Sequence, residues 1–196
     1  MTADVDLSHP SPEDADEFIA AARASKAVML PWVDAADSPV RYGAYLDRAA
    51  REDTECFLVR HRDCGELVGF VNINSIVRAA FRSGYLGYAG FISHRGRGLM
   101  SAGVSAVVSL AFADLGLHRL EANIQPDNAN SLGLVQRLGF TREGYSPQYL
   151  MIDGQWRDHE RWAVRAETWP ASPGGPASPG GPSSPGGHGG PPRPRR

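Results

Sequence analysis

The strongest constraint on the fold is a junction at residues 91–101, where a strand-like run ends, glycines follow and a long apolar helix begins. The helix predicted for residues 98–115 has a single charged residue, Asp114, and its apolar side chains recur at helical spacing. So few charges indicate a largely buried helix. The junction would also present consecutive backbone N–H groups and the positive end of a helix dipole, which together favour a phosphate-bearing ligand.

The rest of the chain alternates strands with helices. Helices are predicted from Ser11, over residues 39–51 and over residues 128–138, the last closed by Gly139. Strands are predicted on both sides of a turn at residues 63–65, over 83–93, over 118–125, and over 145–152 and 156–165. The last two strands are joined across Asp153-Gly154, a dipeptide suited to hairpin turns. This order predicts an α/β (α+β) domain with helices layered over one sheet.

The composition changes sharply near the C-terminus. The predicted domain covers residues 1–168, and residues 169–196 form a Pro/Gly/Ser-rich tail that is predicted to be disordered. We interpret the tail as either a passive extension or a weak docking arm for an acidic surface. The chain has 20 Lys and Arg against 22 Asp and Glu, and three of the arginines lie in the tail. The domain is therefore acidic, which argues against nucleic-acid phosphates as its main partner.

Cysteine and histidine usage bounds the chemistry. Cys56 and Cys64 form no Cys-x-x-Cys motif, and the six histidines show no ligand spacing, so no metal site is expected. The N-terminus lacks the apolar core of a signal peptide, and no stretch is long enough to span a membrane. The expected location is cytoplasmic, with both thiols reduced.

The glycine junction carries the first specific signal. Its spacing is neither a Walker phosphate loop nor Gly-x-Gly-x-x-Gly, so the residues alone leave open a tight turn with solvated arginines. Residues 95–100, Arg-Gly-Arg-Gly-Leu-Met, resemble the signature that holds the pyrophosphate of coenzyme A in the GNAT superfamily of N-acetyltransferases. Met100 departs from the general signature and matches the RimJ/RimL branch. The resemblance implies cofactor binding by Phe91, Ile92, Ser93, Arg95, Gly96, Arg97, Gly98, Leu99, Met100 and Ser101.

A second block, residues 126–144, resembles the other coenzyme A block of the family. It implies that Asn128 contacts the pantetheine arm and that Ser131 lies near the thiol end. From the residues alone, Asn128 could be a helix N-cap and Ser131 could make a backbone hydrogen bond. RimJ sequences are also similar to three further segments: residues 76–88, residues 149–159 and a Pro-Trp loop at 30–32. The resemblance therefore covers roughly residues 7–168. It implies the GNAT fold, with one mixed central sheet of about six to seven strands and helices on both faces.

The resemblance also implies a reaction. An acetyl group would pass from acetyl-CoA to a primary amine by direct attack in a ternary complex. Backbone N–H groups near Phe91 and Ile92 are expected to bind the thioester carbonyl oxygen. Ser131 is the candidate for hydrogen bonding to the departing sulfur.

For the general base and the acceptor site, the sequence offers several candidate residues. Glu121 is a candidate base, but an ion pair with Arg119 is the interpretation we favour. A water chain through Tyr88 and Asn123 is an alternative. The residues predicted to line the acceptor cleft are Trp32, Arg78, Phe81, Tyr88 and Asn123. For the three aromatic residues, core packing is at least as good an interpretation.

Three functions remain open at this stage. The favoured acceptor is the N-terminal alanine of a ribosomal-type protein. The alternatives are a small amine, such as an antibiotic, polyamine or amino acid, and a non-catalytic acyl-CoA-binding module. The expected partners are a protein N-terminus or small amine, with no nucleic acid, membrane or metal, and the chain is expected to be a monomer or homodimer.

Overall fold

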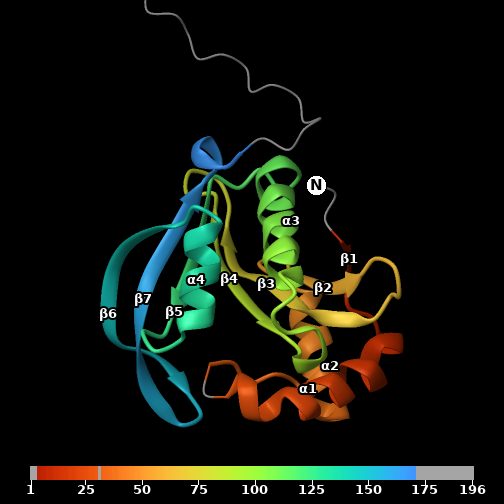
Figure 1. Cartoon of the computed structure of the whole chain (residues 1–196). Coiled ribbons are helices and arrows are strands. Elements are labelled where there is room, and N and C mark those ends of the chain that lie inside the picture. The colour runs from red at the N-terminus through yellow and green to blue at the C-terminus, as the bar shows by residue number, and fades with distance from the viewer. Residues whose placement is uncertain (1–3, 31, 171–196) are drawn as a thin grey trace, which may run out of the picture.

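A mixed sheet of seven strands organises the chain (Figure 1). The computed structural model describes residues 4–30 and 32–170. The strands lie in the order β1-β2-β3-β4-β5-β7-β6, and among the described strands only β4 and β5 run parallel. Their bounds are β1 Val5–Ser8, β2 Glu55–His61, β3 Leu67–Val77, β4 Ser83–Gly90, β5 Arg119–Ile124, β6 Thr141–Ile152 and β7 Gln155–Arg165.

Helices cover both faces of this sheet, as the sequence predicted (Figure 1). The α-helices are α1 Ala15–Met29, α2 Pro39–Ala49, α3 Leu99–Ala113 and α4 Ala129–Arg137, and the 3-10 turns are η1 Pro12–Asp14, η2 Ile92–His94 and η3 Ala166–Thr168. Neighbouring strand residues point to opposite faces, so each strand feeds two cores. Leu58 and Phe70 pack with α1 and α2, whereas Val59 and Val71 pack with α3 and α4.

Helix α3 is buried, as its lack of charge indicated. Val104, Val107 and Val108 have no exposed surface. The close approach to β2 requires a glycine, because a Cβ at Gly103 would lie 2.7 Å from Val59 Cγ1. The helix therefore lies directly against the sheet, which fixes the position of its N-terminus.

Strands β4 and β5 separate at one end, and this separation positions the site. They pair only from Ser83↔Arg119 to Leu86↔Ala122, although β4 continues to Gly90. The last four residues of β4 thus keep β3 as a neighbour but have no partner in β5. Backbone groups and side chains on that side of β4 are available to a ligand.

The end of the domain differs from the prediction. Trp169, assigned above to the tail, packs against Phe112 and donates from Nε1 to Ser109 Oγ at 2.9 Å. The domain therefore extends beyond residue 168. Residues 171–196, the remainder of the predicted tail, lie outside the described residues. No helix in the described part of the chain is long and apolar enough to cross a bilayer.

Candidate active site

The N-terminus of α3 is open to an anion. Gly96 and Gly98 have φ of 79° and 78°, which strongly favours glycine at both positions. Gly98 is the N-cap and supplies no side-chain hydrogen bond, and the first turn of α3 contains no acidic residue. The first N–H groups of a helix lack intrahelical acceptors, so this turn offers uncapped donors at the positive end of the dipole.

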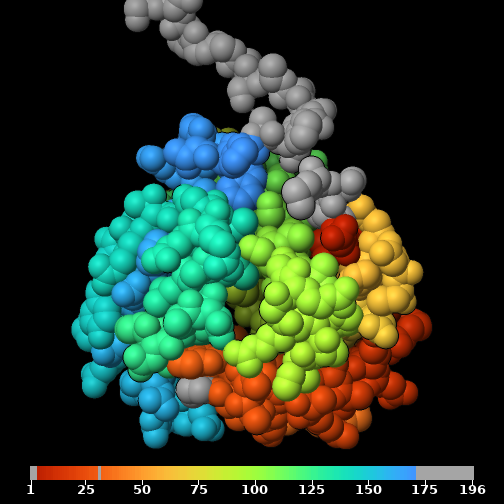
Figure 2. All heavy atoms as spheres, viewed as in Figure 1, coloured from red at the N-terminus to blue at the C-terminus, as the bar shows by residue number. Residues whose placement is uncertain are grey.

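A cavity of about 530 Å³ lies beside this turn, and Figure 2 shows the surface hollowed between α4 and the loop before α3. It reaches across the separated strands to the start of α4, so one space joins both predicted cofactor blocks. Its size falls within the usual range of small-molecule sites. The predicted residues that line it are Trp32, Tyr88, Phe91, Arg95, Gly96, Gly98, Leu99, Met100, Ser101, Asn128 and Ser131. Ile92, Ser93 and Arg97 are predicted cofactor residues that do not line it.

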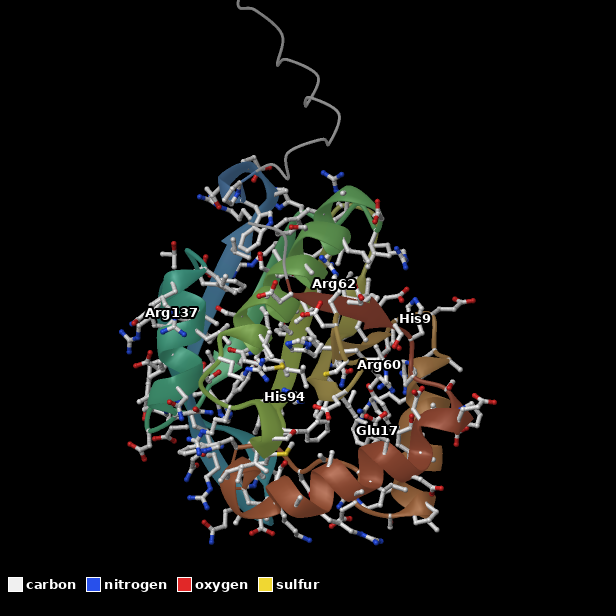
Figure 3. The ribbon with its side chains drawn as sticks, turned by 45° about the vertical axis from the view of Figure 1, so that its right-hand side comes forward. His9, Glu17, Arg60, Arg62, His94 and Arg137 are labelled. Atoms are coloured by element: carbon white, nitrogen blue, oxygen red, sulfur yellow. The ribbon has the colours of Figure 1, made fainter. Side chains whose placement is uncertain are left out.

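The two loop arginines diverge. Arg95 lines the cavity, whereas Arg97 donates to His94 Nδ1 and to His61 Nε2, each at 3.2 Å. Arg97 is thus engaged on the β2 side of the loop, and its role at the phosphates stays a prediction. A second arginine, Arg137 on α4, lines the cavity instead (Figure 3).

Sequence reasoning missed Arg137, although a signal was present. Asn130, Leu134 and Arg137 recur at spacings of four and three, which places them on one face of α4. All three line the cavity. This spacing could have assigned Arg137 to the ligand side of the helix.

The start of α4 holds a polar pair. Asn128 is the N-cap, and its Oδ1 accepts from the Ser131 N–H at 3.2 Å. The Ser131 hydroxyl lies 2.6 Å from the Tyr88 hydroxyl rather than on a backbone carbonyl. Burial raises the pKa of Tyr88 to about 12, with the Ser131 hydrogen bond acting in the opposite direction. Tyr88 therefore stays protonated near neutral pH and can donate a hydrogen bond within the cavity.

The expected carbonyl-binding donors are already used within the fold. Phe91 N–H donates to the Val68 carbonyl at 2.8 Å, and Ile92 N–H donates to Ser25 Oγ at 3.0 Å. This corrects the assignment of those two N–H groups to the thioester. Antiparallel strands alternate their hydrogen-bonding direction, so the N–H groups of Tyr88 and Gly90 point away from β3. They face the gap where β4 has left β5.

Glu121 forms an ion pair with Arg119, which is the interpretation favoured from the sequence. Its carboxylate accepts from Arg119 Nε at 3.0 Å, and Arg119 also pairs with Glu143 through both terminal nitrogens. The carboxylates of Glu143 and Glu121 raise the pKa of Arg119. Glu121 lines neither cavity, which argues against its role as the base.

Three predicted acceptor residues lie elsewhere. Arg78 and Phe81 are in the β3–β4 connection, at the end of β4 remote from the glycine loop. Asn123 lines neither cavity, and its buried Oδ1 has no hydrogen-bond partner among the described residues. Tyr88 and Asn123 also project from opposite sheet faces, because β4 and β5 are in register at Tyr85↔Glu121. The water chain through both residues is therefore not supported.

A second cavity of about 380 Å³ adjoins the first and shares Val33 and Tyr88 with it. It lies on the α1–α2 side of the sheet and includes Asn72 and Asn74 of β3. The buried Tyr45 hydroxyl donates to Asn72 Oδ1 at 3.0 Å. The sequence contained a signal for this polar part of the cavity lining. Asn72 and Asn74 are two residues apart, so they share one face of a strand that is otherwise mostly apolar.

The described residues of the two cavities form neither a thiol site nor a cluster of metal ligands. No cysteine lies among the described lining residues of either one. The described residues also contain no group of three or more His, Cys, Asp or Glu arranged to hold a metal ion.

Comparison with known proteins assigns the chain to a family. Residues 4–141 match the family described as the acetyltransferase (GNAT) domain, and the chain belongs to that family. Over 104 residues it is 40% identical to the [Ribosomal protein uS5]-alanine N-acetyltransferase of Escherichia coli (strain K12), covering 53% of this chain and 54% of the relative. The chain thus spans about half the length of the first curated relatives that it matches.

Two further comparisons bear on the branch. Mycobacterium smegmatis RimJ in complex with CoA-disulfide superposes with a TM-score of 0.79 at 28% identity, covering 86% of this chain and 85% of that one. An L-methionine sulfoximine/L-methionine sulfone acetyltransferase of Pseudomonas aeruginosa is 32% identical over 123 residues, 59% of this chain and 67% of the relative. The seven-stranded mixed sheet is the GNAT fold of the RimJ structure, and the RimJ-type resemblance is confirmed.

Proposed function

We propose that this chain transfers the acetyl group of acetyl-CoA to an α-amine, preferentially that of a protein N-terminus beginning with alanine. The observation that carries the proposal is the meeting of two cavities at Tyr88. One has the open N-terminus of α3 and two arginines on its wall, and the other lies between α2 and β3. This arrangement suits two substrates that occupy separate cavities and meet at Tyr88.

The first cavity fits coenzyme A by its donor chemistry. The first-turn N–H groups of α3, with Arg95 and Arg137, would hold the phosphates. Asn128 and Ser131 would lie along the pantetheine arm. The Tyr88 and Gly90 N–H groups are the donors proposed for the thioester oxygen, in place of those of Phe91 and Ile92.

The transfer itself is proposed as a single displacement. The amine lone pair attacks the thioester carbon, the C–N bond forms, the C–S bond breaks, and one proton passes from nitrogen to the departing sulfur. The hydrogen-bonded hydroxyls of Tyr88 and Ser131 stabilise that sulfur. The described lining residues of the two cavities include no cysteine, which is consistent with attack without an acyl-enzyme.

No carboxylate is available to deprotonate the amine in the described lining of the second cavity. Its one acidic residue, Asp34, is paired with Arg41 at 2.8 Å. The amine is therefore proposed to lose its proton to water before attack. This favours an α-amine, whose pKa is lower than that of a lysine or polyamine.

The test is acetyl-CoA-dependent release of free thiol against a panel of N-terminal peptides, free amino acids and polyamines. Rapid release with alanine-starting peptides supports the proposal. Release only with polyamines would contradict the acceptor assignment. Tight coenzyme A binding without release on any amine would leave only an acyl-CoA-binding module.

A further inference from the structure

The second cavity has an uneven charge. Three charged residues are among its described lining: Asp34, Arg41 and Arg48. Arg41 is compensated, because it pairs with Asp34 at 2.8 Å and with Asp37 at 2.7 Å. Asp37 also binds Lys26 at 2.8 Å, so this network contains equal numbers of cations and carboxylates.

Arg48 is left outside that network. It lies in the last turn of α2 and forms no ion pair with any residue in the described ranges 4–30 and 32–170. Its guanidinium carbon lies 5.3 Å from the centre of the Tyr45 ring, a cation–π distance that orients the group over the cavity wall. Arg48 also lies beside the Cys56 side chain, so its described neighbours are an aromatic ring and a thiol, and none is a carboxylate within ion-pair distance.

A series of contacts connects the Arg48 guanidinium to the part of β4 next to Tyr88, where acetyl transfer is proposed. Tyr45, which carries Arg48 on its ring, donates through its hydroxyl to Asn72 Oδ1. Asn72 is the β3 partner of Gly87, the residue before Tyr88. Arg48 and Asn72 are thus linked through one tyrosine side chain, Arg48 at its ring face and Asn72 at its hydroxyl. An extended acceptor with its α-amine near Tyr88 would advance about 3.3 Å per residue. Arg48 and Tyr88 line the same cavity, and the second or third acceptor residue is the one proposed to meet Arg48.

We propose that Arg48 binds a carboxylate of the acceptor, so that the preferred substrate carries an acidic group close to its α-amine. This inference rests on the proposed acetyl transfer and adds a specificity determinant to it. Two sources provide the same chemistry: an acidic side chain at position 2 or 3 of a polypeptide, or the free carboxylate of an amino acid. Polyamines and lysine-rich N-termini would meet an uncompensated like charge and are disfavoured.

The experiment measures kcat/KM for alanine-starting hexapeptides that differ only by Glu, Gln or Lys at position 2 or 3. The wild-type chain is expected to prefer Glu over Gln about fivefold, the scale of a partly exposed ion pair, and to use Lys least. Arg48→Glu is expected to invert the order of the Glu and Lys peptides, and Arg48→Lys to preserve it. Comparing alanine with alaninamide in both the wild type and Arg48→Glu separates the two sources. A free carboxylate site requires the ratio of alanine to alaninamide activity to fall in the variant, whereas the different amine pKa values of the two compounds affect both enzymes equally.

Arg51→Glu is the matched control. It makes the same charge change three residues away, where the arginine pairs with Asp53 and does not line the cavity. Its peptide preferences should match the wild type. Equal use of the three peptides by the wild type, or an unchanged order in Arg48→Glu, would overturn the role of Arg48 and leave acetyl transfer intact. Failure of every amine to release thiol would overturn both proposals.

Discussion

Replacing Ser25 by alanine should loosen the cofactor loop. Ser25 lies on α1 with no exposed surface, and its Oγ accepts from the Ile92 N–H at 3.0 Å, just after β4. Removing the acceptor leaves a partly buried donor unsatisfied, which costs about 1–2 kcal/mol. Alanine recovers about 0.5 kcal/mol through its higher helix propensity. We expect a net loss of about 1 kcal/mol and a fall in Tm of roughly 2–4 °C.

The assay is urea denaturation followed by steady-state kinetics with acetyl-CoA. The KM for acetyl-CoA should rise in Ser25→Ala, because Ile92 opens the loop that leads to the N-terminus of α3. Ser25→Cys should fall between alanine and the wild type, since sulfur is a weak acceptor. Ser105→Ala, at a serine for which no side-chain hydrogen bond is recorded in the described structure, is the control. The reasoning is refuted if the free energy of unfolding of Ser25→Ala lies within about 0.3 kcal/mol of that of Ser105→Ala.

Three further outcomes are expected. Gly98→Glu should abolish coenzyme A binding measured by calorimetry, because it introduces a side chain at a φ of 78° and a negative charge at the phosphate site; retained affinity would contradict this placement. Ser131→Ala and Tyr88→Phe should each lower kcat by about tenfold to a hundredfold with little change in the Kd for coenzyme A, and the double variant should be no worse than the poorer single one. Equal losses in kcat and affinity would reduce the pair to a binding role. The value of kcat/KM should rise with pH and reach a plateau above the acceptor amine pKa of about 8. It should not fall again up to pH 10, because the pKa of Tyr88 is raised to about 12 and its hydroxyl stays protonated. A fall in kcat/KM below pH 10 would refute the assignment of Tyr88.

The parts of the fold that the sequence predicted are those governed by local rules. The charge-poor pattern predicted the burial of α3, and Asp153-Gly154 predicted its hairpin because both residues adopt positive φ, 49° and 71°. Gly96 and Gly98 were predictable for the same reason. In each case the deciding interaction lies within a few residues of the signal.

The parts that failed depend on which way a backbone or side chain points. Phe91 lies at the expected place, but strand alternation turns its N–H towards Val68 and leaves the outward direction to Gly90. Arg95 and Arg97 are equivalent in sequence, yet only the folded loop brings Arg97 to the imidazoles of β2 and η2. Such directions depend on register between distant segments, which a single sequence does not specify.

The lack of an unpaired carboxylate in the described lining of the second cavity has a consequence for selectivity. If the enzyme binds and acetylates only the neutral amine, its rate with each acceptor is proportional to the fraction of that amine that is deprotonated. At pH 7 an α-amine with a pKa near 8 is about one tenth neutral, whereas a lysine amine with a pKa near 10.4 is neutral in about one molecule in 2,500. This difference alone favours an N-terminus over a lysine by about two orders of magnitude. A carboxylate base would take the proton from the bound ammonium form, so that protonated lysine amines could also react. Pairing of Asp34 with Arg41 therefore favours α-amine specificity.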